Sequence, residues 1–295
     1  MANNLPNLHQ HLPMVEDGIN IIQVGIGGTG GQVANNILRT IGGMARDMQD
    51  RMRYIGIDGD TFETKNLGRQ LCVPNDMGKN KAQVIVGRYA NAYNVSTDSA
   101  SFIDEYIKGP EDIIKNIHSG FTNIIIDNLD KNRPRNWIND AVKEYIRTYR
   151  FGYIYIISTG NGEWNGQVSM GCVHKSNSRI LAYTPGKTVL DDPYHFSIPS
   201  PYLVSPELLD VTIDDREEAL SCADRALANV QTLAANQTAA NICFNYANSI
   251  ISQFIHQVDD KPDCPQTVGT VRFNALNNAY TMERLTDEYL AKGII

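Results

Sequence analysis

Cysteine is scarce in this chain, and none of it is paired in the way that metal sites or disulfide frameworks require. The 295 residues contain five cysteines, at widely spaced positions, and no C-x-x-C pair: Cys72, Cys172, Cys222, Cys243 and Cys264. An odd number of scattered cysteines is typical of reduced thiols in a cytosol, and the missing pairs argue against a zinc site. We therefore expect a cytoplasmic protein without structural zinc.

Long apolar runs and an excess of positive charge are missing as well. No stretch approaches the roughly 20 apolar residues that span a bilayer. Lys and Arg number 26 against 33 Asp and Glu, which gives a formal net charge of -7, and no Lys or Arg precedes Arg39. Nucleic acid and anionic membranes select clustered Lys and Arg, and a secretory signal peptide opens with basic residues. We therefore expect no nucleic acid, no membrane and no export signal, and partners that are small molecules or proteins.

Short apolar segments alternate with amphipathic ones through the first half of the chain. Residues 19–24, 53–58, 123–127 and 153–159 have the composition of strands, and residues 32–41, 79–94 and 135–148 that of helices. This alternation predicts an α/β fold with a doubly wound, Rossmann-like and mostly parallel sheet. Turn residues separate two further strands at 166–173 and 179–183, so we expect the sheet to become mixed in the C-terminal half.

Proline interrupts the chain after these strands. Five prolines lie between residues 185 and 206, and the acidic run of Asp214, Asp215, Glu217 and Glu218 follows. Because proline breaks regular hydrogen bonding, we expect little regular structure there and a long loop over residues 184–225. A long helix is predicted over residues 226–256, and a last strand over residues 268–273.

The glycine-rich segment Gly25-Ile26-Gly27-Gly28-Thr29-Gly30 joins the first predicted strand to the first helix. Its glycines allow a tight turn and a close approach to phosphate, while the helix N-terminus presents backbone N–H groups to negative charge. Asp58, at the end of the second strand, is placed to accept hydrogen bonds from a ribose diol. The alternatives without a ligand are a glycine turn that only packs the helix on the sheet and, for Asp58, a solvent-facing side chain. The loop and Asp58 alone suit NAD as well as ATP.

A series of polar motifs follows in a fixed order. It comprises Asp58-Gly59-Asp60, Asn66-Leu67-Gly68-Arg69-Gln70, Gly78-Lys79-Asn80-Lys81, and Asp127-Asn128-Leu129-Asp130-Lys131 with Arg135 beyond it. This order closely resembles the ThiF, MoeB and HesA adenylyltransferases and the ubiquitin-activating enzymes, whose signature is G-x-G-G-x-G, D-x-D, N-x-x-R-Q, G-x-x-K and D-x-x-D-N. The resemblance is specific over residues 19–173 and looser beyond. It implies an N-terminal tail over residues 1–18 and one ThiF-like adenylation domain over residues 19–295, with a crossover loop at about 184–225.

The resemblance implies an adenylyltransferase that uses ATP and Mg²⁺ to activate the C-terminal glycine of a ubiquitin-like or sulfur-carrier protein. Attack on the α-phosphate releases pyrophosphate, so cations must meet the negative charge that accumulates. Arg69 offers a planar fork of donors and Lys81 a compact ammonium, while Asp130 is the expected Mg²⁺ ligand. Asp60 is expected to bind the nucleotide, and Asn66 and Gln70 to orient the phosphates or their own loop. Taken singly, Lys81 would be a solvated helix residue, Arg69 a surface ion-pair partner and Asp130 a helix cap.

The sequence departs from the family at two positions that bear on the site. Lys131 replaces the family's usual Asn, and we expect it to contact a phosphate instead. The family's N-terminal Arg, given to ATP across a dimer, has no counterpart before Arg39, although a homodimer is still the expected assembly.

Cys222 is the candidate thiol for onward transfer of the activated carboxylate. It follows the proline-rich stretch and precedes the long helix, much as the family's loop cysteine does. A partly buried, inert thiol is an equal alternative, since the acidic run upstream would raise the pKa of this thiol. Cys72 is too near the nucleotide loop for this role, and Cys172 and Cys243 have the pattern of packing residues.

Two other functions remain open on the sequence. An NAD-dependent oxidoreductase would use the same glycine loop and Asp58, but leaves Arg69, Lys81 and Asp130 unexplained. A nucleotide-binding pseudoenzyme that serves as a partner-binding module is favoured by Lys131 and by the missing N-terminal Arg.

Overall fold

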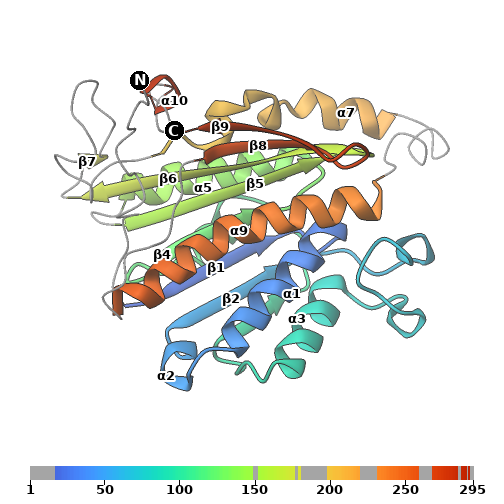
Figure 1. Ribbon diagram of the computed structural model, residues 1–295, viewed down its shortest axis with the longest axis horizontal. Coiled ribbons are helices and arrows are strands. Elements are labelled where there is room, and N and C mark those ends of the chain that lie inside the picture. Colours follow the sequence, from blue (N-terminus) through green and yellow to red (C-terminus); the bar gives the residue numbers. More distant parts are fainter. Residues whose placement is uncertain are drawn as a thin grey trace.

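One twisted sheet with helices on both faces forms the centre of the protein (Figure 1). The computed structural model describes residues 17–148, 152–176, 179–180, 198–219, 231–258, 268–284, 287–290 and 292. The strand order is β3-β2-β1-β4-β5-β6-β8-β9, and β7 pairs with β6.

The first five strands are parallel and the others antiparallel. The parallel strands are β1 (Ile19–Val24), β2 (Met52–Ile57), β3 (Ala100–Ile103), β4 (Thr122–Asp127) and β5 (Gly152–Asn161). The antiparallel strands are β6 (Asn165–Ser176), β7 (Arg179–Ile180), β8 (Val268–Asn274) and β9 (Ala279–Arg284). The predicted doubly wound, Rossmann-like and mixed sheet is therefore confirmed.

Helices cover the two faces of the sheet. On one face lie α1 (Gly28–Gly42), α3 (Lys81–Ala92) and α9 (Leu233–Val258), and on the other α4 (Glu111–Ile114) and α5 (Asn132–Thr148). The remaining short elements are α2 (Arg46–Gln49), η2 (Thr64–Asn66), η3 (Pro74–Asp76), α6 (Pro201–Val204), η4 (Pro206–Leu209), α7 (Val211–Ala219) and α10 (Asp287–Leu290). None of the helices in the described part of the chain combines the length and hydropathy that crossing a bilayer requires.

The central strand β1 shows why the chain folds this way. All six of its residues are buried, as expected for a parallel strand covered on both faces. Ile19 and Ile21 pack with α1, α3 and α9, whereas Ile22 and Val24 pack with α5. The apolar alternation of a single strand thus divides the core into two halves.

Three features of the described fold differ from expectation. The edge strands β3 and β9 escaped prediction because exposed edge residues carry little apolar pattern. Little regular structure was expected within residues 184–225, and this is wrong for residues 198–219, which form α6, η4 and α7. Pro201 and Pro206 lie in the first turn of their helices, where a missing N–H costs nothing. The long helix begins at Leu233, just after Thr232, whose hydroxyl accepts a hydrogen bond from the Ala235 N–H.

Candidate active site

Three loops and the end of β5 lie together at the carboxyl edge of the parallel strands. The strand order changes direction between β1 and β4, and ligands of doubly wound sheets bind at such a switch point. The glycine loop follows β1, and Asp58-Gly59-Asp60 follows β2. Asp127 ends β4, and Asn128-Leu129-Asp130-Lys131 follows it. The end of β5 completes this edge of the sheet.

Each glycine of the loop has its own environment. Gly25 has a φ of +90°, and a Cβ there would lie 2.5 Å from the Asn128 carbonyl oxygen. A Cβ on Gly30 would lie 2.0 Å from the Gly25 carbonyl oxygen, and one on Gly28 would lie 2.2 Å from the Asn236 side chain. Gly27, in contrast, faces open space. Three of the glycines therefore serve packing, and Gly27 faces the space through which a phosphate would approach.

The N-terminus of α1 lies directly behind that open space. Gly27 is its N-cap and supplies no side-chain hydrogen bond. Backbone N–H groups in a first helical turn have no partner within the helix, so they can bind an anion.

Gln23 holds the glycine loop in place, a role that the sequence analysis did not assign to it. Its Nε2 donates to the Gly30 carbonyl at 2.7 Å and to Asn128 Oδ1 at 2.9 Å, and its Oε1 accepts from the Tyr54 hydroxyl at 2.7 Å. A glutamine in a short strand of mainly apolar residues is the signal that could have identified it.

Asp58 and Asp60 lie in contrasting environments. The Asp58 carboxylate accepts the Ile26 N–H at 2.6 Å and the Asp60 N–H at 2.8 Å, and burial raises its pKa in spite of these bonds and of nearby Lys81. Burial would also raise the pKa of Asp60, but hydrogen bonds from Lys81 and Tyr106 outweigh it and hold that pKa below its usual value. Asp58 therefore fixes the glycine loop against the end of β2, and each of its oxygens has further lone-pair capacity for a sugar hydroxyl.

Lys81 is buried rather than solvated. Its side chain is 9% exposed, and its Nζ lies 2.8 Å from Asp60 Oδ2. The simplest reading of a helix lysine is thus wrong here. The structure brings an ammonium group and two carboxylates together beside the glycine loop.

Tyr106, which the sequence did not single out, belongs to the same group. Its hydroxyl donates to Asp60, its ring lies against Gly59, and its residue surface is 61% exposed. A Cβ on Gly59 would lie 2.5 Å from the Tyr106 ring, so this position requires glycine. The negative charges of Asp60, Asp58 and Asp130 lie close enough to help raise the pKa of Tyr106 to about 12, after the Asp60 hydrogen bond and burial.

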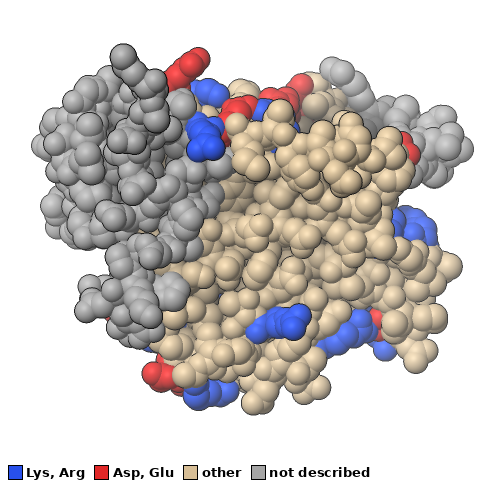
Figure 2. All heavy atoms as spheres, in the orientation of Figure 1, with Lys and Arg blue, Asp and Glu red and all other residues tan. Residues whose placement is uncertain are grey.

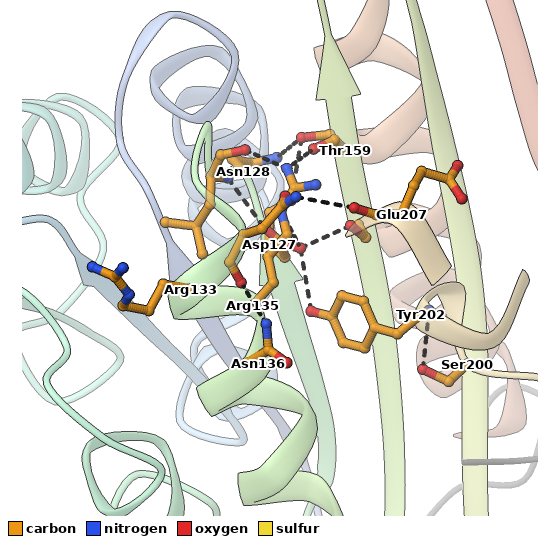
Figure 3. A network of polar contacts seen from close by, with 12 residues as sticks. Asp127, Asn128, Arg133, Arg135, Asn136, Thr159, Ser200, Tyr202 and Glu207 are labelled. Carbon is orange, nitrogen blue, oxygen red and sulfur yellow. Dashed lines mark hydrogen bonds and ion pairs between the residues drawn. The ribbon is translucent and has the colours of Figure 1, made fainter. Parts of the chain in front are cut away.

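Asp127 and Arg135 form a buried ion pair beneath the loop after β4 (Figure 3). Arg135 Nε lies 3.3 Å from Asp127 Oδ2 without the alignment of a hydrogen bond, and Nη2 donates to the Thr159 carbonyl at 2.9 Å and to the Leu129 carbonyl. Asp127 also accepts from Ser158 at 2.7 Å and from the Tyr202 hydroxyl at 3.2 Å. The arginine of the family pattern therefore supports the loop from within.

Asp130 and Lys131 are exposed at the tip of this loop. Within the described residues, Asp130 has no hydrogen-bond or ion-pair partner, and those residues hold no cluster of three or more His, Cys, Asp or Glu side chains that could bind a metal. Mg²⁺ usually keeps several waters and takes only one or two carboxylates beside substrate phosphates. An exposed carboxylate at the switch point fits that requirement.

The segment from Asn66 to Gln70 is held by its own contacts. Asn66 is buried, and its Oδ1 accepts the Glu63 N–H at 2.8 Å, so this side chain organises its loop. Arg69 Nε lies 3.5 Å from the Lys65 carbonyl oxygen, and no contact in the described part of the chain joins Arg69 to Lys81 or Asp130. Gln70 Oε1 is buried without a hydrogen-bond partner among the described residues. Arg88 of α3 donates through Nη1 to the Leu71 carbonyl at 3.2 Å, which holds the end of this segment against the helix that carries Lys81.

The described cysteines are not activated. Cys172 and Cys243 are fully buried, as expected for packing residues, and burial raises the pKa of each to about 12. Burial and the negative charge of Asp76 raise the pKa of Cys72 as well. Cys222 lies outside the described residues.

A groove of about 600 Å³ extends from the end of β5. Its lining includes three glycines that contribute no side chain, Gly160, Gly162 and Gly166. It also includes Glu207, Arg272 and Tyr280. A Cβ on Gly160 would lie 4.0 Å from Arg135 Nη1, so the groove begins beside the loop that carries Asp130.

Comparison with known proteins identifies this arrangement. The ThiF family model matches residues 18–288. The chain belongs to the ThiF family. No curated protein matches it in sequence.

Solved structures share the ThiF-family fold at low sequence identity. E. coli MccB with ATP is 20% identical, with a TM-score of 0.54 over 92% of this chain and 64% of the MccB chain. E. coli MccB with AMPCPP and MccA is 18% identical, with a TM-score of 0.53 over 92% of this chain and 65% of that one. PaaA is 14% identical, with a TM-score of 0.56 over 92% of this chain and 74% of the PaaA chain. The chain thus spans just under two thirds of MccB.

Proposed function

We propose that this protein is an ATP-dependent adenylyltransferase that activates the carboxylate of a peptide or of a carrier protein. The observation that carries the proposal is that three features lie together at one switch point: a helix N-terminus without a side-chain cap, the Lys81–Asp60 pair, and Asp130, which has no partner among the described residues. ThiF-family membership and the fold shared with ATP-bound MccB support it. The NAD alternative uses only the first of these features.

The reaction accounts for the residues at the site. An oxygen of the substrate carboxylate bonds to the α-phosphorus of ATP, the bond from that phosphorus to the bridging oxygen breaks, and pyrophosphate leaves with the electron pair. The α1 N-terminus would hold phosphate oxygens beside Gly27, and Lys81 and Arg69 would meet the growing charge. Mg²⁺ held by Asp130 would neutralise the departing phosphates. Lys131 would contact a phosphate in place of the family's Asn.

The nucleoside would lie along the edge made by Asp58, Gly59 and Tyr106. Asp58 retains acceptor capacity for a ribose hydroxyl, and the exposed Tyr106 ring is placed to stack on a base. Asn66 and Gln70 would hold the loop that carries Arg69.

The groove beyond β5 is our candidate route for the carboxylate substrate. A wall lined by glycines would admit an extended chain end close to Arg135. A ubiquitin-like or sulfur-carrier protein that ends in glycine suits such a narrow approach, and the structure of MccB in complex with MccA supports testing a peptide as the other class. Cys222 is proposed to receive the activated carboxylate as a thioester.

We also propose a homodimer formed through α1 and α9. A fifth of the chain is charged, so a helix of 26 residues would carry about five charges, yet α9 has no Asp, Glu, Lys or Arg. Figure 2 shows an uncharged surface across most of α9 and α1. Depletion of charge is typical of the core of an interface between identical subunits.

ATP–pyrophosphate exchange tests the proposed function. With Mg²⁺ and small β-grasp proteins ending in Gly-Gly, or short peptides, we expect exchange that depends on the added carboxylate. Asp130→Ala should reduce the rate by roughly a hundredfold or more, whereas Asp140→Ala, at an exposed position of α5, should leave it unchanged.

The alternatives have their own outcomes in this assay. Nucleotide binding without exchange toward any candidate would favour the pseudoenzyme, to which the Lys131 replacement points, and binding of NAD in preference to ATP would favour the oxidoreductase. With an active substrate, Cys222→Ala should keep exchange but abolish any thiol-sensitive protein adduct. An adduct that persists would place the acceptor elsewhere.

A further inference from the structure

The N-terminus of α5 is capped from a distant part of the chain. Asp214 of α7 accepts the Asn132 N–H at 2.8 Å through Oδ1 and the Arg133 N–H at 2.7 Å through Oδ2. Asp214 is 2% exposed and lies 82 residues from Asn132 in sequence. A carboxylate at this place satisfies two N–H groups of the first helical turn and meets the positive end of the helix dipole.

Other contacts hold the same two segments together. Asn132 Nδ2 donates to the Glu207 and Asp210 carbonyls, each at 3.0 Å, and Asn136 Nδ2 donates to the Leu209 carbonyl at 2.9 Å. Tyr202 reaches Asp127 from α6 (Figure 3). The described crossover segment, residues 198–219, is therefore docked on the start of α5 and on the strand end before it.

Asp130 lies two residues before the first residue of α5, Asn132. Aspartate side chains readily bond to the backbone N–H two residues ahead, which from Asp130 is the Asn132 N–H. Asp214 already occupies that N–H group. The Asp130 carboxylate is exposed and has no partner among the described residues.

We propose that Asp214 is a positioning residue that takes over the cap of α5 and thereby keeps Asp130 free for the metal–nucleotide complex. The functional half of this inference rests on the proposed adenylation. Without the Asp214 carboxylate, Asp130 turns back to cap its own helix and leaves the position that Mg²⁺ requires. In this way, docking of residues 198–219 on α5 determines whether the Asp130 carboxylate is free to bind the metal or caps its own helix.

A double-mutant cycle tests the capping step without any nucleotide. Hydrogen exchange at the Asn132 and Arg133 amides is followed in the full-length chain with Asp130→Ala, Asp214→Ala and the double substitution. Asp130→Ala alone should leave protection unchanged, because Asp214 caps the helix. In the Asp214→Ala background the same change should lower protection by roughly tenfold, because the substitute cap is lost. Equal effects of Asp130→Ala in both backgrounds would overturn the proposal.

The catalytic consequence is measured by pyrophosphate exchange against Mg²⁺ concentration. Asp214→Ala should lower kcat by roughly tenfold to a hundredfold and raise the Mg²⁺ concentration for half-maximal rate, while KM for ATP changes little. Asp214→Asn, whose single carbonyl oxygen still accepts, should be intermediate. Asp215→Ala is the matched control, because Asp215 is exposed and pairs only with Arg133 in the described structure, at 2.8 Å.

The two arms separate the possible failures. If the Asp214→Ala variant had the same kcat and the same Mg²⁺ dependence as the Asp215→Ala control, the positioning role would be refuted. A wild-type protein without exchange would refute the proposed function, and the amide cycle would still decide whether Asp214 displaces Asp130.

Discussion

At the scale of single residues, three carboxylates at one edge of the sheet have three different environments. Asp58 is held by backbone N–H groups and has a raised pKa, Asp60 is paired with Lys81 and has a lowered pKa, and Asp130 is exposed. Residue type alone would make them equivalent. Their surroundings suit them to different tasks: fixing a loop, holding a cation and binding a metal.

Lys81→Met should raise the pKa of Asp60, because it removes the ammonium group that counteracts burial. Since the folded-state pKa of Asp60 is lowered, the stability from this pair is present above the unfolded pKa of about 3.9 and is lost as pH falls through the lower folded value. The difference in unfolding free energy between wild type and Lys81→Met should therefore be largest near neutral pH and decrease below about pH 4.

Carboxyl-carbon NMR titration and urea unfolding at several pH values measure both effects. Lys79→Met is the control, because Lys79 is exposed two residues away. An unchanged Asp60 pKa in Lys81→Met would show that the pair does not control this carboxylate.

Tyr106 should contribute to nucleotide binding through its ring. Stacking on a base is worth about 1 to 3 kcal/mol, so Tyr106→Ala should weaken ATP binding by roughly fivefold or more. Tyr106→Phe keeps the ring against Gly59 and should lose less. Calorimetric titration with ATP measures this, with Phe102→Ala, 39% exposed on β3, as the matched aromatic control. Equal affinities of Tyr106→Ala and wild type would remove Tyr106 from the site.

At the scale of elements, the loop after β4 depends on a buried charge pair rather than on its own sequence. Arg135 joins α5 to the ends of β4 and β5 through Asp127, Leu129 and Thr159. Removal of one partner from such a pair leaves an uncompensated charge inside the protein, which is far costlier than the loss of an exposed pair.

Arg135→Met should therefore lower the free energy of unfolding by about 3 to 5 kcal/mol. Arg147→Met, on the same helix, removes an exposed pair with Glu144 and should change it by less than about 1 kcal/mol. Urea denaturation measures both. Similar small changes for the two variants would mean that Asp127 is satisfied by Ser158, Tyr202 and the Leu129 N–H alone.

At the scale of the whole molecule, the proposed dimer makes α1 and α9 its contact surface. Light scattering should give twice the chain mass of 32.8 kDa. Asn241→Arg, at an exposed position of α9, should shift the mass toward one chain because it places two like charges at an isologous contact. Thr148→Arg, at an exposed position on α5 on the other face, should have no effect. A wild-type monomer, or a dimer that tolerates Asn241→Arg, would argue against this surface.

Much of the fold was predictable because its signals are local. Apolar periodicity and turn residues predicted the strands β1 and β4, the glycine loop and the helix α3. Edge strands β3 and β9 did not, since half-exposed strands lack that pattern. The prediction of little regular structure in the proline-rich stretch was wrong for residues 198–219, because Pro201 and Pro206 begin helices instead of ending them.

By itself, the sequence determined the family and the chemical types at the site, because the order of short motifs is local information. Only the tertiary structure decided that Lys81 is buried against Asp60, that Tyr106 lies on Gly59, and that Asp214 caps α5 in place of Asp130. These contacts join residues 21, 47 and 82 positions apart. Such partners are chosen by the path of the chain and by the need to satisfy buried polar groups, which no local pattern records.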